Sequence, residues 1–206
     1  MVVTWRGMVP YVETLDAQRR YRDEVIAGRE PEALWLLEHP PVITTGRRDA
    51  AIDAARVADS GYDIVATERG GLATCHEPGQ LVGYCFVDAS RRGIRAIVAG
   101  LELGIVGWLA TLGVLGADRP CHPGVWVGHD KVCAVGLHVR RGVTMHGFAL
   151  NLVNDLAGFS LITPCGIVDG GVTSVKRLRG SAPTPSEAAA GVGAAVTSAL
   201  AAGAAR

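Results

Sequence analysis

Cys165 is the residue whose setting first suggests chemistry. It lies between Pro164 and Gly166 in the stretch LITPCGIVDGGVTSVKRL, which holds no second cysteine. A cysteine placed this way is either a small buried apolar residue or a nucleophile on a tight turn. The chain has five cysteines and no C-x-x-C pair, which argues against a disulfide framework and favours a reducing cytoplasm.

Lysine is scarce in this chain. Lys131 and Lys176 are the only lysines among 20 basic residues, and Lys131 begins the apolar run KVCAVG. A partly desolvated lysine amine can lose its proton, which a guanidinium cannot, and its compact charge can favour a nearby thiolate. The alternative is a lysine at a strand end whose stem packs while its amine reaches water. The residues alone leave both interpretations open.

A glycine-rich stretch, ERGGLATCHEPGQLVGY, covers Glu68 to Tyr84. Arg69, Gly70 and Gly71 can present backbone N–H groups and a guanidinium to a ligand, although Gly-Gly by itself is more typical of an ordinary turn. The histidines and cysteines do not have the spacing of a zinc site, and we expect no metal. The residues with metal-binding side chains in and around these motifs are Cys75, His76, Cys121, His122, His129 and Cys133.

Length and composition limit the number of domains and the classes of partner. The 206 residues, 49% apolar and 19% charged, predict one globular domain over residues 1–206. Basic and acidic residues number 20 each, so no net field directs the chain to nucleic acid or to an anionic membrane. The N-terminus lacks the pattern of a signal peptide. The uncharged, Ala-rich stretch from Ala188 to Ala205 predicts a packed C-terminal helix at about 185–205 rather than a membrane span, and TPSE at 184–187 predicts its capping box.

Hydrophobic periodicity predicts an α+β fold. Helices are expected over Tyr11–Gly28 and Ser90–Leu112, and strands over several shorter runs. Consecutive strands without intervening helices argue against a Rossmann arrangement and predict a mixed, largely antiparallel sheet flanked by helices. The predicted strands are Glu32–His39, Pro41–Thr45, Val125–Val127, Lys131–Val139 and Val143–Leu152, with hairpin turns at 128–130 and 140–142.

Four motifs in order resemble the lipoyl(octanoyl) transferase family. ERGGLATCHEPGQLVGY is similar to its R-G-G-x-x-T-x-H-G-P-G-Q-L-V-x-Y signature. LLEHPPVITTGRR, GVWVGHDKVCAVGLHVRRGVTMHGFALNL and PCGIVDGGVTS resemble three further family segments. The resemblance covers roughly residues 5 to 178. It implies the fold of the biotin and lipoate protein ligase catalytic domain.

The resemblance also implies an activity. These enzymes move an octanoyl group from acyl carrier protein to a lysine of a lipoyl domain, in 2-oxoacid dehydrogenases and the glycine cleavage H protein, through a cysteine thioester and without a cofactor. Cys165 matches the nucleophile and Lys131 its partner. Three segments match the substrate pocket: Arg69, Gly70, Gly71, Leu72, Ala73, Thr74, Cys75 and His76; Ala134, Val135 and Gly136; and Gly147, Phe148 and Ala149.

One departure from the family pattern concerns the pocket. Glu77 replaces the glycine of H-G-P-G-Q. Because Pro78 follows, we expect Glu77 to be extended and the turn to survive. We further expect its carboxylate to pair with His76 or Arg69 and to point away from Cys165, so that Glu77→Gly leaves the fold intact and does not lower transfer.

Three rivals remain open at the level of sequence. They are a related acyltransferase with an altered donor or acceptor, a non-catalytic carrier-protein-binding module, and an ATP-dependent lipoate ligase. The ligase is disfavoured because RGGLATCH lacks that relative's extended glycine-rich loop. Two Arg-Arg pairs, Arg47-Arg48 and Arg140-Arg141, are either solvated turns or a guide for the acidic carrier protein.

Overall fold

The larger of two sheets forms the centre of the molecule. The structure is a computed structural model that describes residues 1–48, 52, 54–119, 122–162 and 170–203. The sheet has seven strands, of which β1 and β2 pair in parallel and the other neighbours antiparallel. In spatial order these are β1 (Val2–Met8), β2 (Ala33–Glu38), β6 (Gln80–Phe86), β10 (Val143–Asn151), β9 (Asp130–Arg140), β8 (Gly124–Val127) and β7 (Ala117–Asp118). The predicted mixed, largely antiparallel sheet is confirmed.

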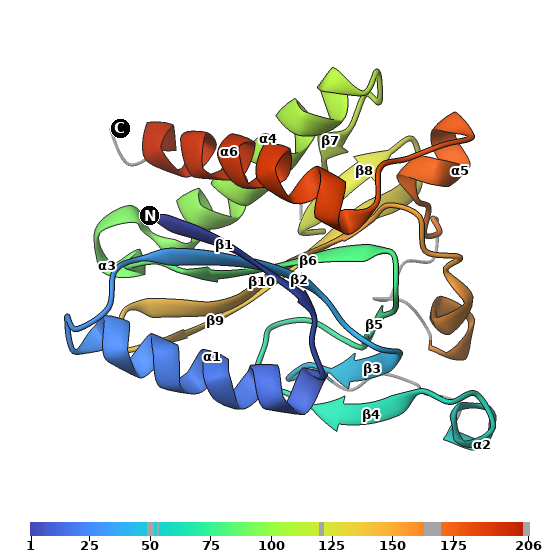
Figure 1. The fold of residues 1–206 in the computed structure, drawn as a ribbon, viewed down its shortest axis with the longest axis horizontal. Helices are drawn as coiled ribbons and strands as arrows, with labels where there is room; N and C mark the ends of the chain where they lie inside the picture. The colour runs from blue at the N-terminus through green and yellow to red at the C-terminus, as the bar shows by residue number, and fades with distance from the viewer. Residues whose placement is uncertain (49–51, 53, 120–121, 163–169, 204–206) are drawn as a thin grey trace.

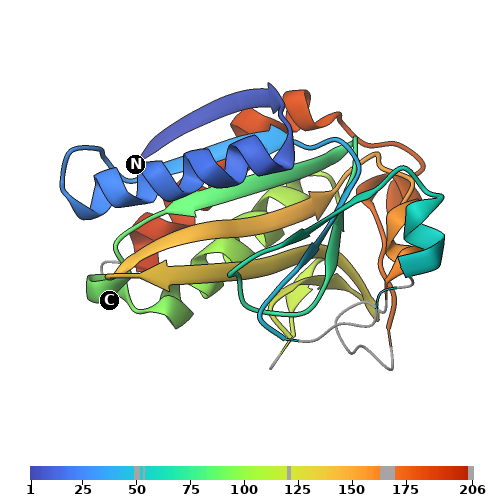
Figure 2. The ribbon, with the colours of Figure 1, turned by 90° about the horizontal axis from the view of Figure 1, so that it is seen from below.

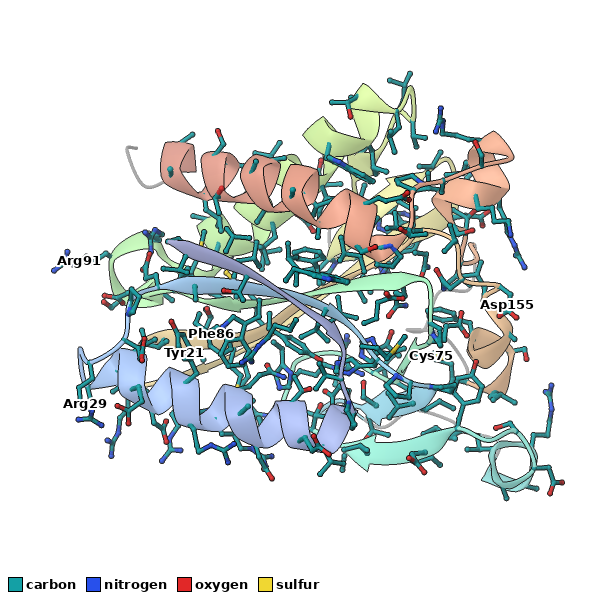
Figure 3. All side chains as sticks on the ribbon, viewed as in Figure 1. Tyr21, Arg29, Cys75, Phe86, Arg91 and Asp155 are labelled. Carbon is teal, nitrogen blue, oxygen red and sulfur yellow. The ribbon has the colours of Figure 1, made fainter. Side chains whose placement is uncertain are left out.

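Successive side chains of the central strands point to opposite faces of the sheet and contribute to two separate hydrophobic cores. In β2, Trp35 and Leu37 face α1 (Tyr11–Ile26), whereas Leu34 and Leu36 face the opposite core. Figure 1 shows α1 on one side of the sheet with α4 and α6 on the other, and Figure 2 shows α1 lying in front of the strands. Tyr21 and Phe86 point toward one another between α1 and the sheet, with ring centroids 5.0 Å apart (Figure 3).

The Ala-rich C-terminal helix packs on the second face as predicted. α6 (Pro185–Gly203) lies against α4 (Ile94–Thr111), and small residues allow the close approach: a Cβ on Gly104 would lie 2.5 Å from the Cα of Val196. The capping box is present, since the backbone N–H of Thr184 donates to Glu187 Oε2 at 2.8 Å. Among the described residues, α4 has the length and apolar composition of a membrane span, but one of its faces is core.

The prediction of one helix over Ser90–Leu112 is wrong. The chain forms a short α3 (Ala89–Arg92) and then α4, separated by Gly93 at φ 77° and ψ 143°. That conformation leaves the helical region and is accessible to glycine at little cost. The apolar periodicity continues across this break, so the sequence alone predicts a single helix.

A second, smaller sheet and its helices flank the first. β3 (Val42–Thr45) pairs in parallel with β4 (Asp63–Ala66) and antiparallel with β5 (Thr74–His76). A third core joins this sheet to η1, a 3₁₀ helix at Ala157–Leu161. The remaining helices are α2 (Ala54–Ala58) and α5 (Val175–Arg179).

Candidate active site

A cavity lies between β9, β10 and the chain from Arg69 to His76. The cavity brings together three segments that are far apart in sequence. Its lining residues are Tyr11, Arg69, Gly70, Gly71, Leu72, Thr74, His76, Val82, Tyr84, Lys131, Ala134, Val135, Gly136, His146, Gly147, Phe148 and Ala149.

Most of the residues predicted for the pocket line this cavity, but Ala73 and Cys75 do not. Their side chains are buried in the third core, against η1. The reason is the alternation of β5, which sends Thr74 and His76 to the cavity and Cys75 to the opposite side. Figure 3 labels Cys75 between the sheets and the outer segment that carries Asp155.

Arg69 fixes the glycine-rich segment at the edge of the cavity. Its Nη2 donates to the carbonyl oxygen of Thr44 at 2.6 Å, and the side chain is buried. The backbone N–H of Gly70 donates to Leu137 O at 3.0 Å, which ties the segment to β9. Arg69 therefore positions backbone groups as well as carrying charge.

Tyr11, Tyr84 and His146 form a wall of the cavity that was not among the predicted pocket residues. Tyr84 and His146 lie inside two of the quoted motifs, whereas nothing in the sequence around Tyr11 distinguishes it from an ordinary core residue. Burial lowers the pKa of His146 to about 3 and raises the pKa of Tyr11 to about 12. Both groups are therefore neutral at physiological pH, so this wall of the cavity suits an uncharged ligand.

His76 and His39 are also held neutral. The amide oxygen of Gln80 can only accept, so the 2.8 Å contact assigns the proton of His76 to Nδ1. Burial depresses the pKa of His76 well below its ordinary value, and lowers that of His39 to about 4. His39 Nε2 accepts from the hydroxyl of Tyr84 at 2.6 Å, and this bond holds the Tyr84 side chain in the cavity wall.

Lys131 lies at the cavity in a partly desolvated position. Its Nζ donates to Pro123 O at 3.1 Å and lies 4.7 Å from the ring centroid of Trp126. Its backbone N–H donates to Gly171 O at 2.9 Å, and its carbonyl accepts from Thr173 N at 3.0 Å. The chain six to eight positions after Cys165 therefore runs beside Lys131, while Cys165 itself lies outside the described residues.

The thiols that the structure describes are poor nucleophiles. Cys75, Cys85 and Cys133 are free and buried. Burial raises the pKa of all three thiols, that of Cys85 to about 12, so each is protonated at neutral pH. Among the described residues, no three His, Cys, Asp or Glu side chains are grouped as metal ligands.

The turn after Glu77 forms as expected, but the carboxylate does not have the expected partners. The turn survives: Gln80 N donates to Glu77 O at 3.1 Å across Pro78 and Gly79, with Gly79 at φ 89°. The predicted pairing with His76 or Arg69 is wrong. The carboxylate is instead buried among donors of Tyr62 and of residues 154–158 on the far side of β5 from the cavity.

Comparison with known proteins identifies relatives along nearly the whole chain. Residues 10–197 match the family model described as the lipoyl protein ligase A/B catalytic domain. An octanoyltransferase of Nitratidesulfovibrio vulgaris is 43% identical over 188 residues, covering 88% of this chain and 86% of that protein. The mitochondrial octanoyl-(acyl-carrier-protein):protein N-octanoyltransferase of Xenopus tropicalis is 45% identical, covering 82% of this chain and 74% of that protein.

Solved structures share the fold at low sequence identity. A lipoate protein ligase from T. acidophilum with bound lipoic acid superposes with a TM-score of 0.69 at 16% identity, covering 98% of this chain and 83% of that one. Biotin protein ligase from Aquifex aeolicus superposes with a TM-score of 0.57 at 11% identity, covering 100% and 72%. The expected ligase-like fold is confirmed, and the chain belongs to the lipoyl protein ligase A/B catalytic domain family, in which its relatives in sequence are octanoyltransferases.

Proposed function

We propose that this octanoyltransferase works through an acyl thioester on Cys165, with Lys131 as the partner of that cysteine. The observation that carries the proposal is the backbone pairing of Lys131 with Gly171 and Thr173 at the edge of a largely apolar cavity. Gly171 and Thr173 follow Cys165 by only six and eight positions in the sequence, which supports a place for Cys165 near Lys131. The buried, protonated state of Cys75, Cys85 and Cys133 further favours Cys165.

The first half-reaction is a thioester exchange. The Cys165 thiolate attacks the thioester carbonyl of octanoyl-acyl carrier protein, and the octanoyl group is then bonded to Cys165. The carrier thiolate leaves and takes up the proton of Lys131, which becomes neutral. Exchange of one thioester for another costs little free energy. The positive charge of Lys131 favours the attacking thiolate.

The second half-reaction forms an amide. The lysine amine of a lipoyl domain attacks the Cys165 thioester, the cysteine leaves as a thiolate, and Lys131 in its neutral form accepts the proton lost by the amine. Because an amide is more stable than a thioester, transfer needs no ATP. The mechanism requires reduced thiols, which favours a reducing compartment such as the cytoplasm.

The cavity holds the acyl chain in this proposal. Its walls are largely apolar or neutral, and the backbone of Gly70 and Gly71 borders it. The residues that would surround the acyl chain belong to one catalytic domain. We take this domain to comprise all the described residues, α6 included. The donor and the acceptor are proteins, and both must deliver their reacting atoms to Cys165, beside Lys131.

The test is a transfer assay with purified components. The protein is mixed with octanoyl-acyl carrier protein and an unmodified lipoyl domain, without ATP, and the mass of the lipoyl domain is followed. We expect octanoylation of one lysine, and none with Cys165→Ser because a hydroxyl is far less ionised than a thiol at neutral pH. Transfer that requires ATP, or full transfer by Cys165→Ser, would reject the mechanism.

A further inference from the structure

Glu77 has a buried carboxylate that the transfer mechanism does not use. The residue is 3% exposed, and it is not among the residues that line the active-site cavity. Oε1 accepts from Asn154 Nδ2 at 2.8 Å and from Leu156 N at 2.9 Å. Oε2 accepts from the hydroxyl of Tyr62 at 2.7 Å and from Gly158 N at 3.2 Å. All four groups are donors, so an ionised carboxylate satisfies them and an uncharged amide cannot satisfy all of them.

Three of the four donors belong to one short segment, Asn154 to Gly158. Leu156 in this segment has φ 69°, a left-handed conformation that a leucine adopts only where its surroundings impose it. The bond from Leu156 N to Glu77 stabilises that conformation at the start of η1. Glu77 therefore determines how the chain leaves β10 and enters η1.

The same segment leads toward the proposed nucleophile. Ile162 follows η1, pairs with Ile52 in an isolated bridge, and is three positions before Cys165 in the sequence. Glu77 thus anchors the described chain on the upstream side of Cys165.

A continuous path of hydrogen bonds joins Glu77 to Lys131 on the downstream side. Asn154 Nδ2, bonded to Glu77, also donates to Asn151 Oδ1 at 3.1 Å. Asn151 Nδ2 donates to Thr173 O at 3.0 Å, and Thr173 N donates to Lys131 O at 3.0 Å. One buried network therefore reaches both chain segments that flank Cys165, and the backbone of the partner lysine.

We infer that Glu77 is a positioning residue for acyl transfer in this chain. The inference rests on the proposed roles of Cys165 and Lys131. In the described part of the chain, Glu77 hydrogen-bonds neither Lys131 nor a residue that lines the cavity, and it acts on the segments that flank Cys165 in the sequence. Because the carboxylate lies outside the cavity, its removal should change the rate of the chemical step and leave binding of the octanoyl donor unaltered. This reverses the expectation that Glu77→Gly does not lower transfer.

The test compares two variants of Glu77 with a matched control. Glu77→Gln keeps the shape and removes the charge, and Glu77→Gly removes the side chain. Tyr62→Phe removes the bond from Tyr62 to the same carboxylate but leaves every bond to residues 154–158 in place. For each, kcat and KM for octanoyl-acyl carrier protein are measured well below the melting temperature, which is recorded separately. Wild-type transfer and inactive Cys165→Ser establish first that the proposed function holds.

We expect kcat to fall about 10- to 100-fold in Glu77→Gln and Glu77→Gly, with KM unchanged, because small misplacements of reacting groups carry losses of this size. Tyr62→Phe should keep wild-type kcat although its melting temperature falls. If Glu77→Gly does not fold, Glu77→Gln decides. Folded Glu77 variants with wild-type kcat, a change confined to KM, or an equal fall of kcat in Tyr62→Phe would each overturn the inference while leaving the transferase assignment intact.

Discussion

At the scale of single residues, Lys131 has two proposed roles: its positive charge favours the thiolate of Cys165, and its neutral amine accepts a proton. Lys131 donates to a backbone carbonyl and lies over the ring of Trp126, an environment that a guanidinium could also occupy electrostatically. Only an amine can give up a proton and act as a base near neutral pH. The two roles therefore separate in Lys131→Arg, which keeps the charge.

We expect Lys131→Arg to lose about 10²–10⁴-fold in the rate of transfer, the range typical of a general base. The measurement is steady-state transfer to a lipoyl domain, with circular dichroism as a control for folding. Near-normal activity of Lys131→Arg would reject the proton-transfer role and leave only the electrostatic one.

His146 makes a second prediction at this scale, for stability. Its pKa is about 3 when folded and ordinarily 6.5, so between these values the unfolded chain binds a proton that the folded chain does not. Stability contributed by the neutral imidazole is present above pH 6.5 and is lost as the pH falls toward 3. At pH 5 the loss is about 2 kcal/mol, from 1.4 kcal/mol for each pH unit.

The matched variant is His146→Asn, because asparagine tolerates the positive φ of 61° at this position. Urea unfolding at pH 7 and pH 5 should show a smaller loss of stability for this variant than for the wild type. The remaining pH dependence should come from the other histidines whose pKa values are depressed by burial, namely His39, His76 and His138. An identical pH dependence in both proteins would contradict the assignment to His146.

At the scale of elements, the close contact between α4 and α6 gives a pair of substitutions with opposite signs. Gly104 and Gly107 lie in the same helix, but a Cβ on Gly104 would meet the backbone of Val196 at 2.5 Å, whereas one on Gly107 would meet nothing within 4 Å. Gly104→Ala should therefore destabilise the fold by about 1–3 kcal/mol through overpacking. Gly107→Ala should stabilise it by about 0.5–1 kcal/mol through helix propensity. Thermal unfolding of both variants checks this, and shifts in the same direction would contradict the packing.

At the scale of the whole molecule, the two Arg-Arg pairs lie in different places. Arg48 borders a hollow beside the active-site cavity, which shares Gly70, Gly71 and Lys131 with it. Arg140 and Arg141 lie at the hairpin between β9 and β10, where Arg140 is 3.9 Å from Asp23 of α1. The first pair thus lies nearer to Lys131, and it is there that the proposed mechanism would have the acidic carrier protein dock.

We expect Arg48→Glu to lower kcat/KM for octanoyl-acyl carrier protein about tenfold at low ionic strength, through slower association. The difference should shrink as salt is added, because screening removes the steering. Arg141→Glu, the same charge reversal at the distant hairpin, should change little. Equal losses in the two variants, or a loss independent of salt, would remove the docking argument.

The parts of the molecule that sequence could predict are those built from contiguous residues. The helix over Tyr11–Ile26, the hairpin strands and the glycine-rich segment follow from local periodicity and motif, and the motifs name three segments that line the cavity. The wall residue Tyr11 was missed because only the packing of α1 on the sheet brings it to the cavity. Three of the partners of Glu77 were missed because they lie 77 to 81 positions further along the chain.

The acyl thioester on Cys165 is tested most directly by mass spectrometry of the whole chain mixed with octanoyl-acyl carrier protein in the absence of an acceptor. We expect one octanoyl group per chain, mapped to the peptide that contains Cys165, and its loss on addition of a lipoyl domain. A stable octanoyl thioester on Cys75 or Cys133, or no acyl-enzyme in a protein that still transfers octanoyl groups, would contradict the mechanism.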